Sequence, residues 1–264
     1  MPPLALVGNL SRDVVEGGPP RIGGGAFHGA RALRALGARG SVVARCDAGD
    51  RPAYLRRLAS IGLPARILRG SATTAFAFRY EGDRRIMEVV HEGDSWTPAD
   101  VAAIPPRAWV HVAPLLRDDF PAETLAALAR GRRVSFDGQG LVRARRTGPL
   151  QLDDDYDAAL LAHVSILKLA EEEADVVLGS VDESTVAALG VPEVLVTYGS
   201  RGSVVFAEGR ATEIPAWPVP RDPTGSGDAF SAAYLSARAG GHAPVAAARR
   251  ATSLVAALLT GRLR

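Results

Sequence analysis

The feature that most constrains the fold is a recurring series of short apolar runs, each bounded by Gly or Asp. Continuous Val, Ile and Leu over such a length predict strands that are buried on both faces of a sheet. These runs lie at residues 4–8, 40–47, 108–114, 133–138, 164–169, 193–199 and 202–209. The length of 264 residues suits one large α/β domain or two small ones.

Segments rich in Ala, Leu and Arg separate these runs and carry apolar spacings of three and four, which is typical of amphipathic helices. They lie at residues 26–37, 51–62, 122–131 and 244–259. Alternating strands and helices indicate an α/β fold, with a mostly parallel central sheet and helices on both faces. We expect residues 1–264 to form a single domain.

One segment, residues 73–90, breaks this rhythm. Apolar and polar residues alternate through Phe76 and Phe78, a turn is indicated at 81–83, and the chain returns through Ile86 and Met87. This pattern predicts a β-hairpin. The hairpin either forms a flap over a functional site or extends an edge of the main sheet, and the pattern leaves both open.

Composition excludes several classes of protein. The formal net charge of the 264 residues is only +2 and the arginines are scattered, so we expect no nucleic-acid binding. Cys46 is the only cysteine, which excludes a disulfide framework and indicates a buried thiol at a strand end. No apolar run approaches the roughly 18 residues of a membrane span. The chain opens on a strand-like segment rather than a signal peptide, so we expect a cytoplasmic protein without membrane contact.

The stretch RDPTGSGDAFSAAYL at 221–235 crowds turn residues in front of a predicted helix from Asp228 to Ala239. The first turn of a helix presents free N–H groups and a positive dipole end, and Gly225 and Gly227 leave room for a close ligand. Such a concavity suits a phosphoryl group, and an ionised Asp228 beside it suits a base for an attacking hydroxyl. The alternative is a helix cap and a simple turn.

Two other glycine motifs fail. The string G-x-x-x-x-G-K-[ST] of P-loops does not occur, and neither Gly23 nor Gly225 opens a complete G-x-G-x-x-G. A nicotinamide-dependent dehydrogenase is therefore disfavoured.

The segment DPTGSGDAF at 222–230 resembles the C-terminal signature of the ribokinase, or PfkB-type, carbohydrate kinase family. The double glycine at the start of 23–37 resembles that family's N-terminal element, and further family-like segments follow in order over almost the whole chain. These segments lie at 7–13, 167–174 and 196–206. The forms that the family motifs take here, DPTG, GGGAFHGAR and LKLAEEEA, are similar to those of a branch that includes inositol kinases. The resemblance implies a three-layer ribokinase-like fold with a small β lid built from about residues 10–22 and 71–92.

The resemblance also assigns roles near the reacting groups. It implies that Asp228 is the catalytic base and that the backbone of 225–227, including Ser226, forms the anion hole. It places Asp13, Gly23, Gly24 and His28 at the hydroxyl substrate. Asp13 as a turn residue and His28 as a buried structural residue are the alternatives. His28 stands where the family has asparagine, and Pro223 stands where it has threonine.

For the phosphoryl donor, the resemblance implies ATP with Mg²⁺. Thr197, Gly199, Gly202 and Lys168 are expected at the nucleotide, and Glu173 is expected near the metal ion. The family's asparagine three residues before that glutamate falls on Ala170. A solvated acidic helix start is the alternative for Glu173.

Together these observations predict an ATP-dependent kinase that phosphorylates a hydroxyl of a small polyol or sugar, with myo-inositol favoured. A nucleoside kinase is an alternative because Phe76, Phe78 and His28 could stack on a base. A kinase-fold binding protein without turnover is another. The expected partners are the hydroxyl substrate and the nucleotide, and a homodimer is compatible with the sequence.

Overall fold

The computed structural model describes residues 3–81, 84–106, 108–217 and 225–262. It contains a large sheet with strands β1 (Leu4–Asn9), β4 (Ser41–Asp47), β5 (Ala65–Gly70), β8 (Trp109–Val112), β9 (Arg133–Asp137), β11 (Ile166–Ala170), β12 (Glu193–Thr197), β13 (Ser203–Ala207) and β14 (Arg210–Ile214). The nine strands run in the order β14-β13-β12-β11-β9-β8-β1-β4-β5. All pairs from β5 to β12 are parallel, whereas β13 and β14 pair antiparallel.

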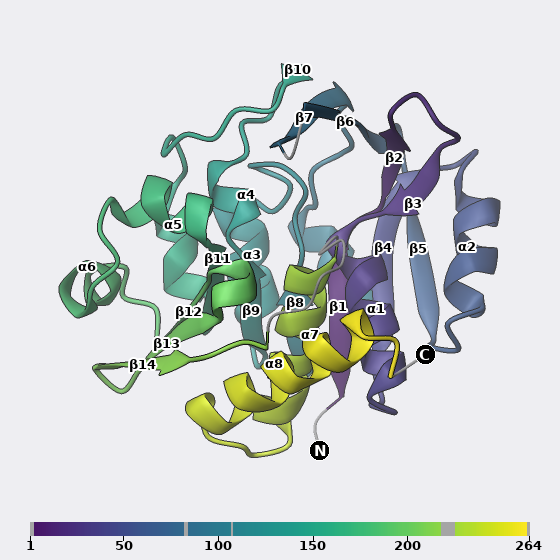
Figure 1. The fold of residues 1–264 in the computed structure, drawn as a ribbon. Helices are drawn as coiled ribbons and strands as arrows, with labels where there is room; N and C mark the ends of the chain where they lie inside the picture. The colour runs from purple at the N-terminus through teal and green to yellow at the C-terminus, as the bar shows by residue number, and fades with distance from the viewer. Residues whose placement is uncertain (1–2, 82–83, 107, 218–224, 263–264) are drawn as a thin grey trace.

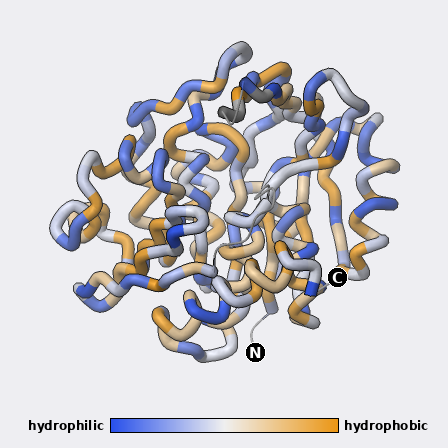
Figure 2. The backbone as a smooth tube through the Cα atoms, viewed as in Figure 1, coloured by the Kyte–Doolittle hydropathy of each residue, from blue (hydrophilic) through white to orange (hydrophobic). Residues whose placement is uncertain are grey.

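Helices cover both faces of this sheet (Figure 1). They are α1 (Gly25–Ala35), α2 (Arg51–Ala59), α3 (Ala122–Ala129), α4 (Gln139–Val142), α5 (Glu171–Leu178), α6 (Glu183–Ala188), α7 (Ser226–Ala239) and α8 (Pro244–Leu259), with 3-10 helices η1 (Pro98–Ala103), η2 (Ala158–His163) and η3 (Gly199–Arg201). Figure 2 shows hydrophobic residues along the strands and hydrophilic residues on the outer turns of helices such as α2. The sequence therefore predicted the three layers correctly.

Strand β1 shows why continuous apolar runs form the middle of the sheet. All six of its residues are buried. Leu4 and Leu6 pack into one hydrophobic cluster with α1, α7 and α8. Ala5 and Val7 pack into a second cluster with α3. Successive side chains of a strand point to opposite faces, so a strand covered on both sides needs apolar residues at every position.

A second, smaller sheet lies above the large one in Figure 1. Its strands are β2 (Ser11–Val15), β3 (Arg21–Gly23), β6 (Thr74–Glu81), β7 (Arg84–His91) and β10 (Gly148–Pro149). Their order is β10-β7-β6-β2-β3. The predicted hairpin forms β6 and β7 of this sheet, so the expectation that it might extend an edge of the main sheet is wrong. Phe76, Phe78 and Val89 form a separate small core with Leu115 and Leu116.

Candidate active site

A small cavity of about 140 Å³ lies where the second sheet meets the first turns of α1 and α7. It is lined by Ser11, Asp13, Gly24, Gly25, His28, Phe76, Phe78, Met87, Leu115, Gln139, Arg143, Gly225 and Asp228. We call it the acceptor cavity. Its lining combines carboxylate, amide and guanidinium groups with an apolar wall from the second sheet. A ligand that has both hydroxyl groups and C–H surface matches such a lining.

Asp228 lies in the first turn of α7 and reaches into the acceptor cavity. A Cβ atom on Gly25 would lie only 2.5 Å from Asp228 Oδ1 and 2.7 Å from Ala113 Cβ. The carboxylate therefore packs against the start of α1 at a point where only glycine fits. This close approach accounts for the glycine at the start of α1.

The pKa of Asp228 corrects the expectation of a fully ionised carboxylate. Burial, followed by the charge of Asp137, raises the pKa of Asp228 to about 7, although Lys168 and Arg143 oppose the rise. Removal from water disfavours the charged form, and a second carboxylate nearby adds to that effect. A base whose pKa lies near the working pH both accepts and releases a proton readily.

This shift predicts a pH dependence. The resemblance implies that Asp228 is the catalytic base, a role that requires its deprotonated form. On that hypothesis we expect kcat/KM for the acceptor to rise about tenfold per pH unit below pH 7 and to level off above it. The folded protein holds this proton up to about pH 7 while the unfolded chain releases it near 3.8, so this group destabilises the fold as pH rises through that window. Steady-state rates from pH 5 to 9 measure the profile. A flat profile between pH 5.5 and 8 would contradict the shift.

Gly225 precedes α7 in the left-handed region, with φ +78°. A Cβ atom there would lie 2.9 Å from the His28 ring. The first N–H groups of α7 belong to this turn, in which Gly225 and Asp228 line the acceptor cavity and Ser226 and Gly227 line a second cavity. Because these N–H groups have no partner within the helix, they can bind an anion.

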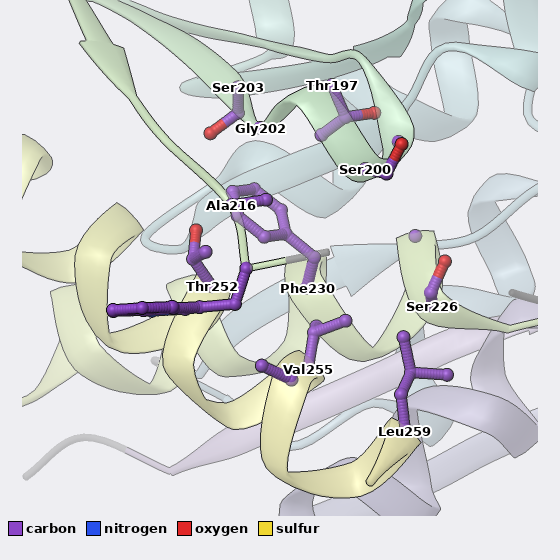
Figure 3. Close-up of a pocket in the computed structure, with 14 residues that line it drawn as sticks. Thr197, Ser200, Gly202, Ser203, Ala216, Ser226, Phe230, Thr252, Val255 and Leu259 are labelled. Atoms are coloured by element: carbon purple, nitrogen blue, oxygen red, sulfur yellow. The ribbon is translucent and has the colours of Figure 1, made fainter. Parts of the chain in front are cut away.

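The second cavity has a volume of about 360 Å³ and lies beside this turn. It is lined by Thr197, Gly199, Ser200, Gly202, Ser203, Ala216, Trp217, Ser226, Gly227, Phe230, Thr252, Val255, Ala256 and Leu259. We call it the donor cavity. Figure 3 shows Ser226 at one end and the apolar side chains of Phe230 and Val255 further along. Three of the residues expected at a nucleotide, Thr197, Gly199 and Gly202, lie here.

Lys168 does not line the donor cavity. Its side chain is buried, and its Nζ lies 3.6 Å from Asp137 Oδ2 and 3.7 Å from Glu173 Oε2. A Cβ atom on Gly227 would lie 3.4 Å from this Nζ, so the ammonium group sits beneath the first turn of α7. Burial disfavours its charge, but Asp137 and Glu173 outweigh burial and raise the pKa of Lys168. The lysine therefore offsets part of the negative charge of these two carboxylates beneath the first turn of α7.

Glu173 is buried beside Lys168 rather than solvated. Its Oε2 accepts a hydrogen bond of 2.7 Å from the Ala170 N–H at the start of α5. The described residues contain no group of three or more side chains that could ligate a metal ion. Mg²⁺ commonly binds through one or two carboxylates together with phosphate oxygens and water. Glu173 and Asp137 are two buried carboxylates that fit this mode of binding.

Of the four residues expected at the hydroxyl substrate, Asp13, Gly24 and His28 line the acceptor cavity, whereas Gly23 does not. Asp13 lies on strand β2, so the turn interpretation is wrong. A Cβ atom on residue 23 would lie 2.0 Å from Asp13 Oδ2, so only glycine fits at position 23. Gly24 has φ +100° and approaches the Asn9 carbonyl. His28 is partly exposed and lines the cavity, so it is not a buried structural residue.

Sequence reasoning missed Gln139 and Arg143, which also line the acceptor cavity. Both follow β9, whose carboxyl end lies at the same edge of the sheet as that of β8. The side chain of Gln139 donates to the Pro114 carbonyl. The charge of Arg143 lowers the pKa of Asp228 against the effect of burial. Polar residues directly after a predicted parallel strand were the signal that could have found them.

Pro223 lies outside the described residues. Across the part of the chain that the structure describes, we find no helix long and apolar enough to cross a membrane.

Comparisons with known proteins agree with this geometry. The family model described as pfkB family carbohydrate kinase matches residues 20–262. Inositol 3-kinase from Oryza sativa subsp. japonica is 30% identical over 257 residues, covering 88% of this chain and 62% of that protein. Ribokinase from Bacillus subtilis (strain 168) is 30% identical over 186 residues, covering 69% of this chain and 61% of that protein. The chain thus spans about three fifths of the length of these relatives.

Among solved structures, the fold is similar to that of a pyrophosphate-dependent kinase in the ribokinase family, complexed with a pyrophosphate analog and myo-inositol. The TM-score is 0.85 at 26% sequence identity, and the match covers 97% of this chain and 95% of that one. The likeness extends over nearly the whole chain, and therefore over both sheets.

Proposed function

The chain belongs to the pfkB family of carbohydrate kinases, and from that premise we propose that it transfers the terminal phosphoryl group of ATP to a hydroxyl of a small polyol, with myo-inositol the favoured acceptor. One observation carries the proposal. The carboxylate of Asp228 lines the acceptor cavity, and Ser226 and Gly227 in the same first turn of α7 line the donor cavity. A base beside an anion-binding turn is what phosphoryl transfer to an alcohol requires.

The acceptor class follows from the lining of its cavity. Asp13, Asp228 and Gln139 offer hydrogen-bonding groups, while Phe76 and Phe78 offer an apolar wall. A cyclitol carries hydroxyls around its rim and C–H bonds on its faces, so it can satisfy both. The small volume of about 140 Å³ favours a single ring. The likeness to rice inositol 3-kinase supports the same acceptor.

The mechanism uses groups of the chain in named roles. An acceptor hydroxyl donates its hydrogen bond to Asp228 and then transfers its proton to that carboxylate. The hydroxyl oxygen forms a bond to the terminal phosphorus while the bridging P–O bond breaks, so ADP leaves with that electron pair. N–H groups of Ser226 and Gly227 stabilise the charge on the phosphoryl oxygens. When bound, Mg²⁺ would supply further charge neutralisation, and Glu173 and Asp137 would hold it.

The second sheet is proposed as a lid, formed by segments of about 10–22 and 71–92. It supplies the apolar wall of the acceptor cavity through β6 and β7. Such a cover excludes water, which otherwise competes with the acceptor for the phosphoryl group.

ATP and pyrophosphate are the two phosphoryl donors that an experiment must distinguish. The donor cavity carries Phe230, Val255 and Leu259, an apolar surface on which a nucleobase can pack. This favours ATP, whereas the similar solved kinase is pyrophosphate-dependent. We expect kcat/KM for MgATP to exceed that for magnesium pyrophosphate by at least about tenfold, since each 1.4 kcal/mol of base contact contributes that factor. Initial rates with each donor at fixed myo-inositol measure the ratio. A higher kcat/KM for magnesium pyrophosphate than for MgATP would show that pyrophosphate, not ATP, is the donor.

The acceptor is tested with a panel of polyols, sugars and nucleosides at fixed MgATP. We expect product formation with myo-inositol to exceed that with any nucleoside. Preferred turnover of a nucleoside would support the alternative in which Phe76, Phe78 and His28 stack on a base. Ligands that raise the melting temperature without any turnover would support a binding protein instead.

A further inference from the structure

We infer that Asp50, which lines neither cavity, positions the acceptor-binding strand of the lid. The inference rests on the proposed function, because it treats the second sheet as the cover of the acceptor cavity. Asp50 immediately precedes α2 and belongs to the body of the molecule. Its carboxylate holds Arg12 on β2 and Thr73 just before β6. We call these three residues the lid clamp.

The contacts of the lid clamp are short. Arg12 Nη2 donates to both carboxylate oxygens of Asp50, at 2.8 and 2.6 Å. Thr73 Oγ1 donates to Asp50 Oδ2 at 2.6 Å and accepts a hydrogen bond of 2.9 Å from the Asp47 N–H. The carboxylate of Asp50 thus links strand β2 and the start of strand β6 to the body of the molecule that carries the large sheet.

Asp50 does not act as an ordinary helix cap. It occupies the N-cap position of α2, where an aspartate normally accepts a hydrogen bond from the second or third N–H of the helix. Its side chain makes no such bond, and its backbone angles are helical, with φ −77° and ψ −26°. The carboxylate is turned toward the lid instead, so the local role that this residue type usually has does not explain it.

Strand geometry carries the effect from the lid clamp to the acceptor cavity. Successive side chains of a strand point to opposite sides. Ser11 and Asp13 line the cavity, and Arg12 between them points the other way to Asp50. In the pairing of β2 with β6, Asp13 lies opposite Phe76. Holding Arg12 and Thr73 therefore sets the position of Asp13 and of the apolar wall together.

The lid clamp is suited to positioning rather than to overall stability. The side chain of Arg12 is 43% exposed, and exposed ion pairs contribute little to the stability of a whole domain. A second tie from α2 supports the same strand, because the hydroxyl of Tyr54 donates to the Ser11 carbonyl at 3.2 Å. Loss of Asp50 should therefore loosen the strand while the fold persists.

The test compares Asp50→Ala with Asp47→Ala, a control in the same turn whose carboxylate accepts from the Gly49 N–H. We expect Asp50→Ala to raise KM for myo-inositol about tenfold, to leave KM for the donor within about twofold, and to increase the share of donor hydrolysed without transfer. Asp50→Glu should restore part of the acceptor affinity. Equal increases in both KM values, or an unchanged acceptor KM, would overturn the inference.

Hydrogen exchange separates this inference from the proposed function, because it needs no turnover. We expect peptides covering residues 11–15 and 74–79 to exchange at least about fivefold faster in Asp50→Ala than in Asp47→Ala. Exchange that is faster in Asp50→Ala, while the wild-type protein phosphorylates no polyol, would support the lid clamp and reject the proposed acceptor. Unchanged exchange in these two strands would reject the lid clamp itself.

Discussion

Replacing Asp228 by Asn is expected to lower kcat for acceptor phosphorylation by a factor of about 10² to 10⁴, the range typical of a positioned general base. The amide keeps the size of the side chain against Gly25, where the carboxylate oxygen has no spare room. It cannot accept the proton of the acceptor hydroxyl as a carboxylate does. The loss should appear in kcat, because the donor cavity is formed by other residues.

Two measurements accompany this variant. Donor affinity, measured by thermal shift or calorimetry, should stay within about threefold of the wild-type value, because one hydrogen bond changes there at most. Asp175→Asn is the matched control, since Asp175 is exposed on α5 away from both cavities. It should retain wild-type kcat. Normal turnover in Asp228→Asn would remove Asp228 from the role of base.

Replacing Gly225 by Ala is expected to lower kcat by about 10² to 10³, which is the typical effect of losing one hydrogen-bond donor to a developing anion. A Cβ atom would lie 2.9 Å from the His28 ring, on a residue with φ +78°. The turn must shift to relieve the contact with His28 and the backbone strain. This shift displaces the first N–H groups of α7. Steady-state kinetics with saturating acceptor measure the loss.

Gly241→Ala is a control for the backbone strain alone. Gly241 follows the same helix at its other end, has φ +89°, and has open space where a Cβ atom would lie. Both substitutions should reduce stability by about 1–2 kcal/mol, the cost of a left-handed residue with a side chain. Only Gly225→Ala should lose turnover. Equal kcat values for the two variants would show that the position of this turn does not matter for catalysis.

The layers of the fold were predictable from the sequence because a short, continuous apolar run between turn residues is typical of a strand buried on both faces. Strand β5 was not predicted, since Arg66 and Arg69 interrupt its apolar pattern at the edge of the sheet. An edge strand is open to solvent on one side and tolerates charges that a central strand excludes. The location of the hairpin also lay beyond the pattern, because alternation fixes the two faces of a strand but not the sheet that it joins.

The candidate site was predictable where the backbone itself is the functional group. Gly225 and Gly227 mark a turn and a helix start in any context, and Asp228 follows directly. The pKa of Asp228 was not predictable, because it depends on burial and on Asp137, which is distant in sequence. The same holds for Lys168, whose neighbours Asp137 and Glu173 are brought to it by separate elements.

The most direct test of the proposed function compares phosphorus NMR spectra of two samples. One holds MgATP, myo-inositol and the purified protein, and the other holds Asp228→Asn in place of that protein. We expect a new phosphomonoester signal that grows in step with ADP in the first sample and is absent over the same time in the second. ADP accompanied only by inorganic phosphate, or the same ester signal at the same rate in both samples, would contradict it.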